Sequence, residues 1–190
     1  MDKKGLMYPL KGNRKSYSID RVLFVDPGIG GTGLAFFEWI DSNANKQQTG
    51  VPVFSDVVRA PKNEGWDNQV WSICAEVRGI LVGLRTETVV LEMPELWSGS
   101  AMSHASATHH AHSGEPADLI KLIYLIGGLG QVARETTGSL PVLISPAEWK
   151  GQLDKKKIHS RIARAYGEGV KYRDHEADAV GMGLAAQGRL

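Results

Sequence analysis

The run from Val22 to Gly33, with the sequence VLFVDPGIGGTG, constrains the fold of this chain more than any other segment. An apolar strand leads into Asp26, and a proline and several glycines follow at once. A buried strand fixes the direction of the carboxylate at its end, and glycines leave open space in front of it because they carry no side chain. The segment therefore predicts a strand, a tight turn and a site for a metal ion or a phosphate group.

The glycines of this run match the dinucleotide-binding pattern G-x-G-x-x-G at Gly28, Gly30 and Gly33. That pattern must open a helix whose first turn holds the pyrophosphate. Here the residues that follow, from 34 to 40, are aromatic and typical of a strand. Two strands separated by glycines form a hairpin, so a nicotinamide or flavin enzyme is disfavoured.

Three other interpretations of the glycine turn remain. Actin-like and sugar-kinase-like ATPases place an Asp and glycines in such a hairpin, but they need two domains and 190 residues supply one. A metal-dependent nuclease would use Asp26 as a ligand and the glycines to admit the nucleic-acid backbone. In a plain hairpin, Asp26 would only cap the turn.

The pattern of the whole chain predicts an α/β protein. Three strands that are close in sequence, 20–26, 33–40 and 52–59, indicate an antiparallel meander. The rest predicts, in order, a helix at 66–84, a strand at 88–91, a helix at 115–136, a strand at 141–144 and helices at 154–166 and 175–187. We expect a mixed sheet with helices on its faces, with residues 1–18 as a flexible basic arm and 19–190 as one domain.

The composition is that of a soluble globular domain, with 42% hydrophobic and 23% charged residues. Cys74 is the single cysteine, which excludes a disulfide within the chain and favours a reducing compartment. The sequence shows neither a signal peptide nor an apolar run long enough to span a bilayer. We therefore expect a cytoplasmic protein without a membrane partner.

The net charge is only +1, but the positive charges are concentrated in two segments. Residues 150–173 contain eight Lys and Arg against Asp154 and Glu168, and residues 1–15 contain five against Asp2. Such segments can bind phosphates even in a protein that is nearly neutral overall. A solvated helix face and a disordered arm explain the same pattern, so the charge alone does not decide between them.

Two further acids stand in settings comparable to that of Asp26. Glu92 follows the apolar residues 89–91, and Asp178 lies in a predicted helix whose later residues are apolar. His175 is three residues before Asp178 and shares its helix face. Two divalent ions about 3.5–4 Å apart can activate water and neutralise a leaving oxyanion, and they require converging carboxylates. A surface acid at Glu92 and simple helix capping at Asp174 remain the structural alternatives.

These motifs, in this order and spacing, resemble the RuvC-type Holliday junction resolvases of the RNase H and retroviral-integrase superfamily. The resemblance rests on the strand, Asp26 and glycine turn, the strand with Glu92, and the run from His175 to Asp178. The segment 146–151, followed by three lysines, is similar to the lysine-bearing segment of that family, particularly of its phage-borne members.

The resemblance implies an RNase H-like mixed sheet, with a three-stranded antiparallel meander, two parallel strands and helices on both faces. It implies a homodimer that nicks two opposed strands of a four-way DNA junction, in the cytoplasm (that of the host if the chain is phage-encoded), with Mg²⁺ or with Mn²⁺ in its place. Asp26, Glu92 and Asp178 would be metal ligands and, with His175, the catalytic residues. We expect the apolar helix 115–136 to form the dimer contact.

Several residues are candidates for contact with DNA. Trp97 follows Glu92 closely, as does the aromatic residue that contacts junction bases in the resembled family, although packing in the core is an equal alternative. The basic candidates are Lys150, Lys155, Lys156, Lys157 and Arg161. The histidines at 104–112 lack companion cysteines, so a loop that orders on DNA is favoured over a zinc site.

Other functions fit parts of the pattern. A nuclease of the same fold that acts on flaps or RNA, a non-catalytic DNA-binding or phage assembly module, and an ATP-binding module are the alternatives. Cleavage tests on different substrates and an ATP-binding test would separate them.

Overall fold

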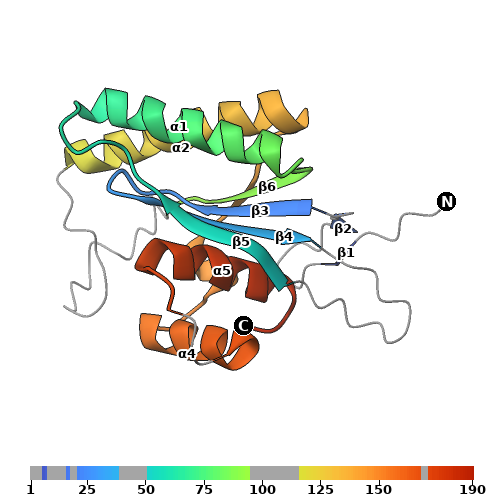
Figure 1. The fold of residues 1–190 in the computed structure, drawn as a ribbon. Helices are drawn as coiled ribbons and strands as arrows, with labels where there is room; N and C mark the ends of the chain where they lie inside the picture. The colour runs from blue at the N-terminus through green and yellow to red at the C-terminus, as the bar shows by residue number, and fades with distance from the viewer. Residues whose placement is uncertain (1–5, 8–15, 18–20, 39–50, 95–115, 168–170) are drawn as a thin grey trace.

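The computed structural model describes residues 6–7, 16–17, 21–38, 51–94, 116–167 and 171–190 (Figure 1). Its main sheet has five strands in the order β5-β4-β3-β6-β7. The strands are β3 (Arg21–Asp26), β4 (Thr32–Glu38), β5 (Val51–Val58), β6 (Thr88–Glu92) and β7 (Val142–Ile144). The helices are α1 (Trp66–Gly83), α2 (Pro116–Thr137), α3 (Pro146–Trp149), α4 (Lys155–Tyr166) and α5 (Asp174–Ala186).

The first three strands of this sheet form the predicted antiparallel meander. β3 pairs with β4, with Asp26 opposite Gly33, and β4 pairs with β5. The turn between β3 and β4 closes through a hydrogen bond from the Gly31 N–H to the Gly28 carbonyl at 3.1 Å. The glycine run is therefore a hairpin, as the aromatic residues after it predict, and it does not open a helix.

The remaining two strands, β6 and β7, run parallel to β3. Val25 pairs with Leu91, and the next residues along the two strands are Asp26 and Glu92. Because the carboxyl ends of parallel neighbours meet at one edge of the sheet, two acids 66 positions apart in the sequence become neighbours.

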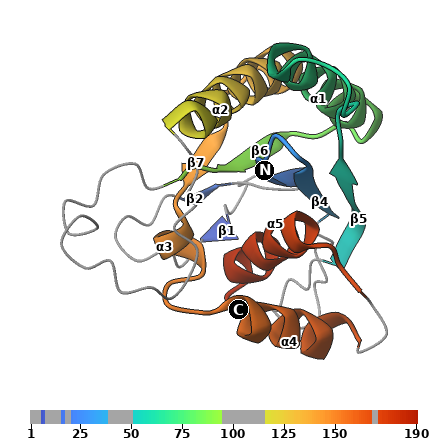
Figure 2. The ribbon, with the colours of Figure 1, turned by 90° about the vertical axis from the view of Figure 1, so that its left-hand side faces the viewer.

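Helices cover both faces of the sheet: α1 and α2 lie on one face, and α4 and α5 on the other (Figures 1 and 2). Side chains of a strand alternate between the faces, so Leu23 and Val25 join the core under α1 and α2. Phe24 joins the core under α5 instead. By the same alternation, Asp26 and Glu92 point toward α5. The expected α/β fold, a mixed sheet with helices on both faces, is confirmed.

Helix α5 lies unusually close to the sheet, because it faces glycines and is itself built of small residues. A Cβ atom at Gly33 of β4 would lie 2.0 Å from the carbonyl oxygen of His175. A Cβ atom at Gly183 of α5 would lie 2.2 Å from the ring of Phe37. This close approach brings the first turn of α5 to the edge where β3 and β6 end.

The short helix α3 was not predicted, because four residues are too few to show a helical period. Ser145 begins it with a capping box, in which its side chain accepts from the Glu148 N–H and the Glu148 side chain accepts from the Ser145 N–H. Within residues 1–18, the strands β1 (Leu6–Met7) and β2 (Ser16–Tyr17) pair antiparallel; the rest of that segment lies outside the described residues. No helix in the described ranges is long and apolar enough to cross a bilayer.

Candidate active site

Asp26 ends the central strand β3, and its side chain is only 8% exposed. Its Oδ2 lies 2.7 Å from Nδ1 of His175, in the first turn of α5. This hydrogen bond is the main reason that the pKa of His175 is raised; burial of the ring works in the opposite direction. The imidazole is therefore held with Nδ1 toward the carboxylate. Because its pKa is raised, the ring stays protonated to a higher pH than that of a free histidine.

Glu92 ends the neighbouring strand β6 and lies beside Asp26. Its Oε2 accepts a hydrogen bond from the indole Nε1–H of Trp149 at 2.6 Å. Burial, followed by the negative charge of Asp26, raises the pKa of Glu92 to about 7. Lys150 and the Trp149 hydrogen bond act against this shift. The site therefore disfavours the ionised form of Glu92 when no cation is present.

Asp178 enters the same region from α5. Burial raises the pKa of this carboxyl group, and the charge of Asp26 adds to the shift. Its Oδ2 is 3.9 Å from Nζ of Lys150, while its Oδ1 is buried without a hydrogen-bond partner. A buried carboxylate oxygen without a partner is costly unless something binds it.

The three carboxylates fit a divalent cation by their chemistry. Mg²⁺ and Mn²⁺ prefer oxygen ligands, and a cation would relieve the repulsion by which Asp26 raises the pKa of both other acids. One oxygen of each carboxylate has a partner, and in the described part of the chain the other oxygen accepts no hydrogen bond. The three partners are Trp149, His175 and Lys150.

The three acids do not yet form a closed metal cage. Among the residues that the structure describes, no three His, Cys, Asp or Glu side chains are grouped closely enough to hold an ion as they stand. The structure thus brings Asp26, Glu92, His175 and Asp178 to one edge of the sheet, with their side chains directed to separate partners.

Of the basic candidates, only Lys150 contacts one of the three acids. Lys155 pairs with Asp174 at 2.8 Å, and its positive charge partly opposes the rise that burial causes in the pKa of Asp178. Lys157 pairs at 3.3 Å with Asp154, the N-cap residue of α4. Lys156 and Arg161 are exposed on α4. Trp97 and the histidines at 104–112 lie outside the described residues.

Trp149 contacts both the core and the candidate site. It is 5% exposed, so it does pack, but its N–H also holds Glu92. Sequence patterns gave no sign of this contact, because the two residues are 57 positions apart and belong to elements with no common period.

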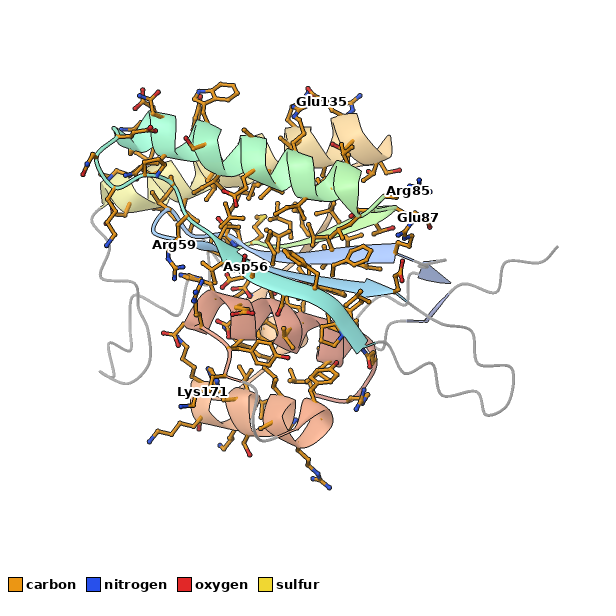
Figure 3. All side chains as sticks on the ribbon, viewed as in Figure 1. Asp56, Arg59, Arg85, Glu87, Glu135 and Lys171 are labelled. Atoms are coloured by element: carbon orange, nitrogen blue, oxygen red, sulfur yellow. The ribbon has the colours of Figure 1, made fainter. Side chains whose placement is uncertain are left out.

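Arg59 is a further residue that the sequence did not single out. It follows β5, its side chain is exposed, and no ion pair in the described ranges involves it. A Cβ atom at Gly31 would lie 3.6 Å from Cγ of Arg59, whereas one at Gly28 would lie 2.9 Å from Cε1 of His175. The glycine turn therefore borders both His175 and Arg59. Figure 3 places Arg59 at the end of the sheet where β5 leads toward α1.

Comparison with solved structures finds the same architecture. Thermus thermophilus RuvC matches with a TM-score of 0.62 and 21% identity, over 87% of this chain and 92% of that one. The same protein in complex with a Holliday junction substrate matches with a TM-score of 0.63 and 22% identity, over 87% and 90%. This chain has the RuvC-type fold. The Fowlpox virus resolvase in complex with Holliday junction DNA matches less well, with a TM-score of 0.48 and 19% identity, over 88% and 97%.

At the level of sequence the likeness to RuvC is weak. No protein-family model matches the chain, and a search of curated proteins finds no match. The RuvC-type fold is thus established by the backbone. The evidence for an activity lies in the side chains at the ends of β3 and β6 and in the first turns of α5.

Proposed function

We propose that this protein is a metal-dependent endonuclease that resolves four-way DNA junctions. The observation that carries the proposal is the convergence of Asp26, Glu92 and Asp178, together with His175, at one edge of a RuvC-type sheet. The solved structures with this fold include a RuvC in complex with Holliday junction substrate. A binding module without catalysis would not need three partly buried acids whose charges oppose one another.

Hydrolysis of a phosphodiester needs an activated water and a neutralised leaving oxygen, and one or two divalent ions supply both when they are bound. Asp26, Glu92 and Asp178 would hold Mg²⁺, or Mn²⁺ in its place. Lys150, beside Asp178, would add a positive charge for a phosphate held at this edge.

His175 is suited to handle a proton. Its Nδ1 is engaged by Asp26, which leaves Nε2 as the ring nitrogen that can exchange a proton with water or with a leaving oxygen. A Cβ atom at Gly28 would lie 3.0 Å from this Nε2, so the glycine keeps the approach to it open. The glycine turn thereby serves the catalytic edge and not a nucleotide cofactor.

The proposed DNA surface lies on both sides of this edge. On the α4 side it consists of Lys150, Lys155, Lys156, Lys157 and Arg161. On the β5 side it includes Arg59, beside Gly31 of the glycine turn. Lysine and arginine bind the backbone through phosphate charge and not through base identity, which suits recognition of DNA shape.

We also propose that the protein acts as a homodimer, because symmetric nicking of opposed strands needs two sites related by a two-fold axis. The outer surfaces of α1 and α2 carry exposed apolar side chains at Trp66, Trp71, Leu119, Ile120, Ile123 and Tyr124. Trp66 and Tyr124 contact each other edge to face at 5.6 Å, which joins the two helices into one patch. A patch of this kind on a soluble protein commonly marks a protein interface.

The deciding experiment is cleavage of a synthetic mobile four-way junction with Mg²⁺, with the products mapped on every strand. We expect paired nicks in opposed strands, and we expect Asp26→Asn to abolish them while it keeps or improves junction binding. Flaps, duplex DNA and RNA–DNA hybrids serve as comparison substrates. Full cleavage by Asp26→Asn, or equal cleavage of all substrates, would contradict the proposal.

The dimer is tested separately by sedimentation of the wild type and of Ile120→Glu/Ile123→Glu at micromolar concentration. The exposed charges should convert a dimer into a monomer while the helical CD spectrum is retained. A wild type that sediments as a monomer would count against the homodimer.

A further inference from the structure

Helix α5 carries both His175 and Asp178, so the rotation and height of its first turn determine where these two side chains point. The helix begins close to the edge strand β5, which contributes none of the candidate ligands. Contacts between β5 and the first turn of α5 therefore act on the position of both side chains from outside the set of candidate ligands.

One side chain, Glu176, links this turn to the strand. Its Oε1 accepts a hydrogen bond from the Ser55 hydroxyl at 2.7 Å. Its Oε2 accepts from the backbone N–H of Arg173, which precedes the helix, at 3.2 Å. Both oxygens are thus engaged, one by β5 and one by the start of α5. Ser55 is opposite Ala35, a core residue under α5, so its side chain faces the helix by the alternation of the strand.

The neighbouring backbone is held at a second point. A Cβ atom at Gly33 would meet the carbonyl carbon of His175 at 2.2 Å and the nitrogen of Glu176 at 2.7 Å, so the peptide between them rests directly on β4. Arg173 also reaches Asp56 at 3.6 Å, but both side chains are 58% exposed, and such an ion pair adds little. The Ser55–Glu176 hydrogen bond therefore ties the rotation of this turn to β5, as the His175–Asp26 hydrogen bond ties it to β3.

We infer that Glu176 and Ser55 are positioning residues of the metal site, acting as a clamp between β5 and α5 that aims Asp178 and His175. The inference rests on the proposed function. Glu176 lies between the two residues in sequence, and its side chain points away from theirs because successive residues on a helix diverge by about 100°. A rotation of the turn would therefore move Asp178 and His175 together. A misplacement of about 1 Å can cost about 10²-fold in rate.

The test compares Glu176→Ala, Glu176→Gln and Ser55→Ala with the wild type. Glutamine keeps both hydrogen bonds, since its oxygen accepts from the Arg173 N–H and its amide donates to the Ser55 hydroxyl oxygen. Glu135→Ala is the matched control, because Glu135 also bridges two elements, from α2 to Arg78 of α1 and to Gln131, but far from the site (Figure 3). Ser55→Ala removes a single donor, so it remains informative if Glu176→Ala folds poorly.

The first readout is Mn²⁺ binding by the DNA-free protein, measured by titration calorimetry. The others are the Mg²⁺ concentration for half-maximal junction cleavage and the junction Kd in EDTA. We expect Glu176→Ala and Ser55→Ala to weaken Mn²⁺ binding about 10-fold, as is usual when a residue that supports a metal ligand is removed. The Mg²⁺ requirement should rise in parallel, the junction Kd should stay within about 2-fold, and Glu176→Gln and Glu135→Ala should resemble the wild type.

Two results would overturn the clamp. In one, Glu176→Ala lowers the Tm but keeps wild-type Mn²⁺ affinity, which would make the contact merely structural. In the other, Glu176→Gln is as impaired as Glu176→Ala, which would assign the effect to charge and not to hydrogen bonding. A wild type that binds Mn²⁺ but does not cut junctions would refute only the proposed function. The clamp would still be tested by the Mn²⁺ affinities of the variants.

Discussion

The indole N–H of Trp149 and the carboxylate of Glu92 form a hydrogen bond of 2.6 Å that joins α3 to the end of β6. The Trp149 ring also lies against α5, where a Cβ atom at Gly181 would come within 2.8 Å of it, and Nζ of Lys150 is 4.9 Å from the ring centroid. One buried side chain thus contacts Glu92 of β6, packs against α5 and lies beside Lys150. It fixes the direction of Glu92 by a neutral donor, so the net charge of the site is unchanged.

The first prediction follows from this contact. Trp149→Phe keeps an aromatic ring in the core and removes the N–H donor, so Glu92 is freed to turn. We expect the Mg²⁺ concentration for half-maximal cleavage to rise about 10-fold. We also expect a loss of about 1–3 kcal/mol in the free energy of unfolding, since a partly buried acceptor loses its partner. Trp71→Phe is the control for the unfolding measurement only, because Trp71 is 66% exposed but belongs to the proposed dimer patch. A Trp149→Phe protein with the wild-type Mg²⁺ requirement would refute the role of the N–H.

The second prediction concerns the pH dependence of stability without metal. The pKa of Glu92 rises on folding from 4.5 to about 7, so the stability present below pH 4.5 is lost progressively as the pH rises to about 7. The pKa of His175 is also raised, and its contribution is lost as the pH rises through that folded value. Both shifts therefore predict that the protein in EDTA is less stable at pH 8 than at pH 5.5.

Glu92→Gln separates the two contributions. It should stabilise the metal-free protein at pH 8 by up to about 3 kcal/mol, from 1.36 kcal/mol per pKa unit, and have a much smaller effect at pH 5. Glutamine can still accept the Trp149 hydrogen bond. Urea unfolding at the two pH values measures this, with Glu87→Gln, an exposed residue before β6, as control. Millimolar Mg²⁺ should recover most of the stability of the wild type at pH 8, and an equal response in Glu92→Gln would speak against a metal at this carboxylate.

Much of this site could be predicted because its main residues follow regular elements. Because side chains alternate along a strand, the sequence indicates which residues of β3 and β6 share a face. The glycines after Asp26 indicate a hairpin, because the residues that follow them are typical of a strand. The partners of the acids could not be predicted in the same way. Trp149 contacts Glu92 from a four-residue helix, and Ser55 contacts the first turn of α5 from an edge strand. Arg59, after that strand, lies beside Gly31 of the glycine turn. Such contacts depend on how elements distant in sequence pack together. The hydrophobic period of a single helix or strand carries no information about that packing.

The third prediction tests that close approach. Gly33→Ala would place a methyl group 2.0 Å from the carbonyl oxygen of His175, a backbone atom that cannot move without shifting α5. We expect a loss of more than about 3 kcal/mol in the free energy of unfolding, or failure to fold, as for overpacking in a core. Gly30→Ala, in the turn just before β4, is the matched control, because nothing lies within 4 Å of its added methyl group. Equal stability of the two variants would show that α5 does not rest on β4 in solution.

The fourth prediction concerns the DNA backbone beyond the glycine turn. Arg59 is exposed beside Gly31, in the glycine turn that His175 also borders, so we expect a DNA strand that crosses the edge at Asp26 to pass close to its guanidinium. Arg59→Gln should weaken junction binding in EDTA and reduce the slope of log K against log salt by about 1, the amount expected for one phosphate contact. Cleavage at saturating junction should change less than about 2-fold. Arg85→Gln removes the same charge at the opposite end of the molecule and should leave the slope unchanged (Figure 3). If both variants lower the slope equally, Arg59 acts only through net charge, and the DNA path does not cross the turn.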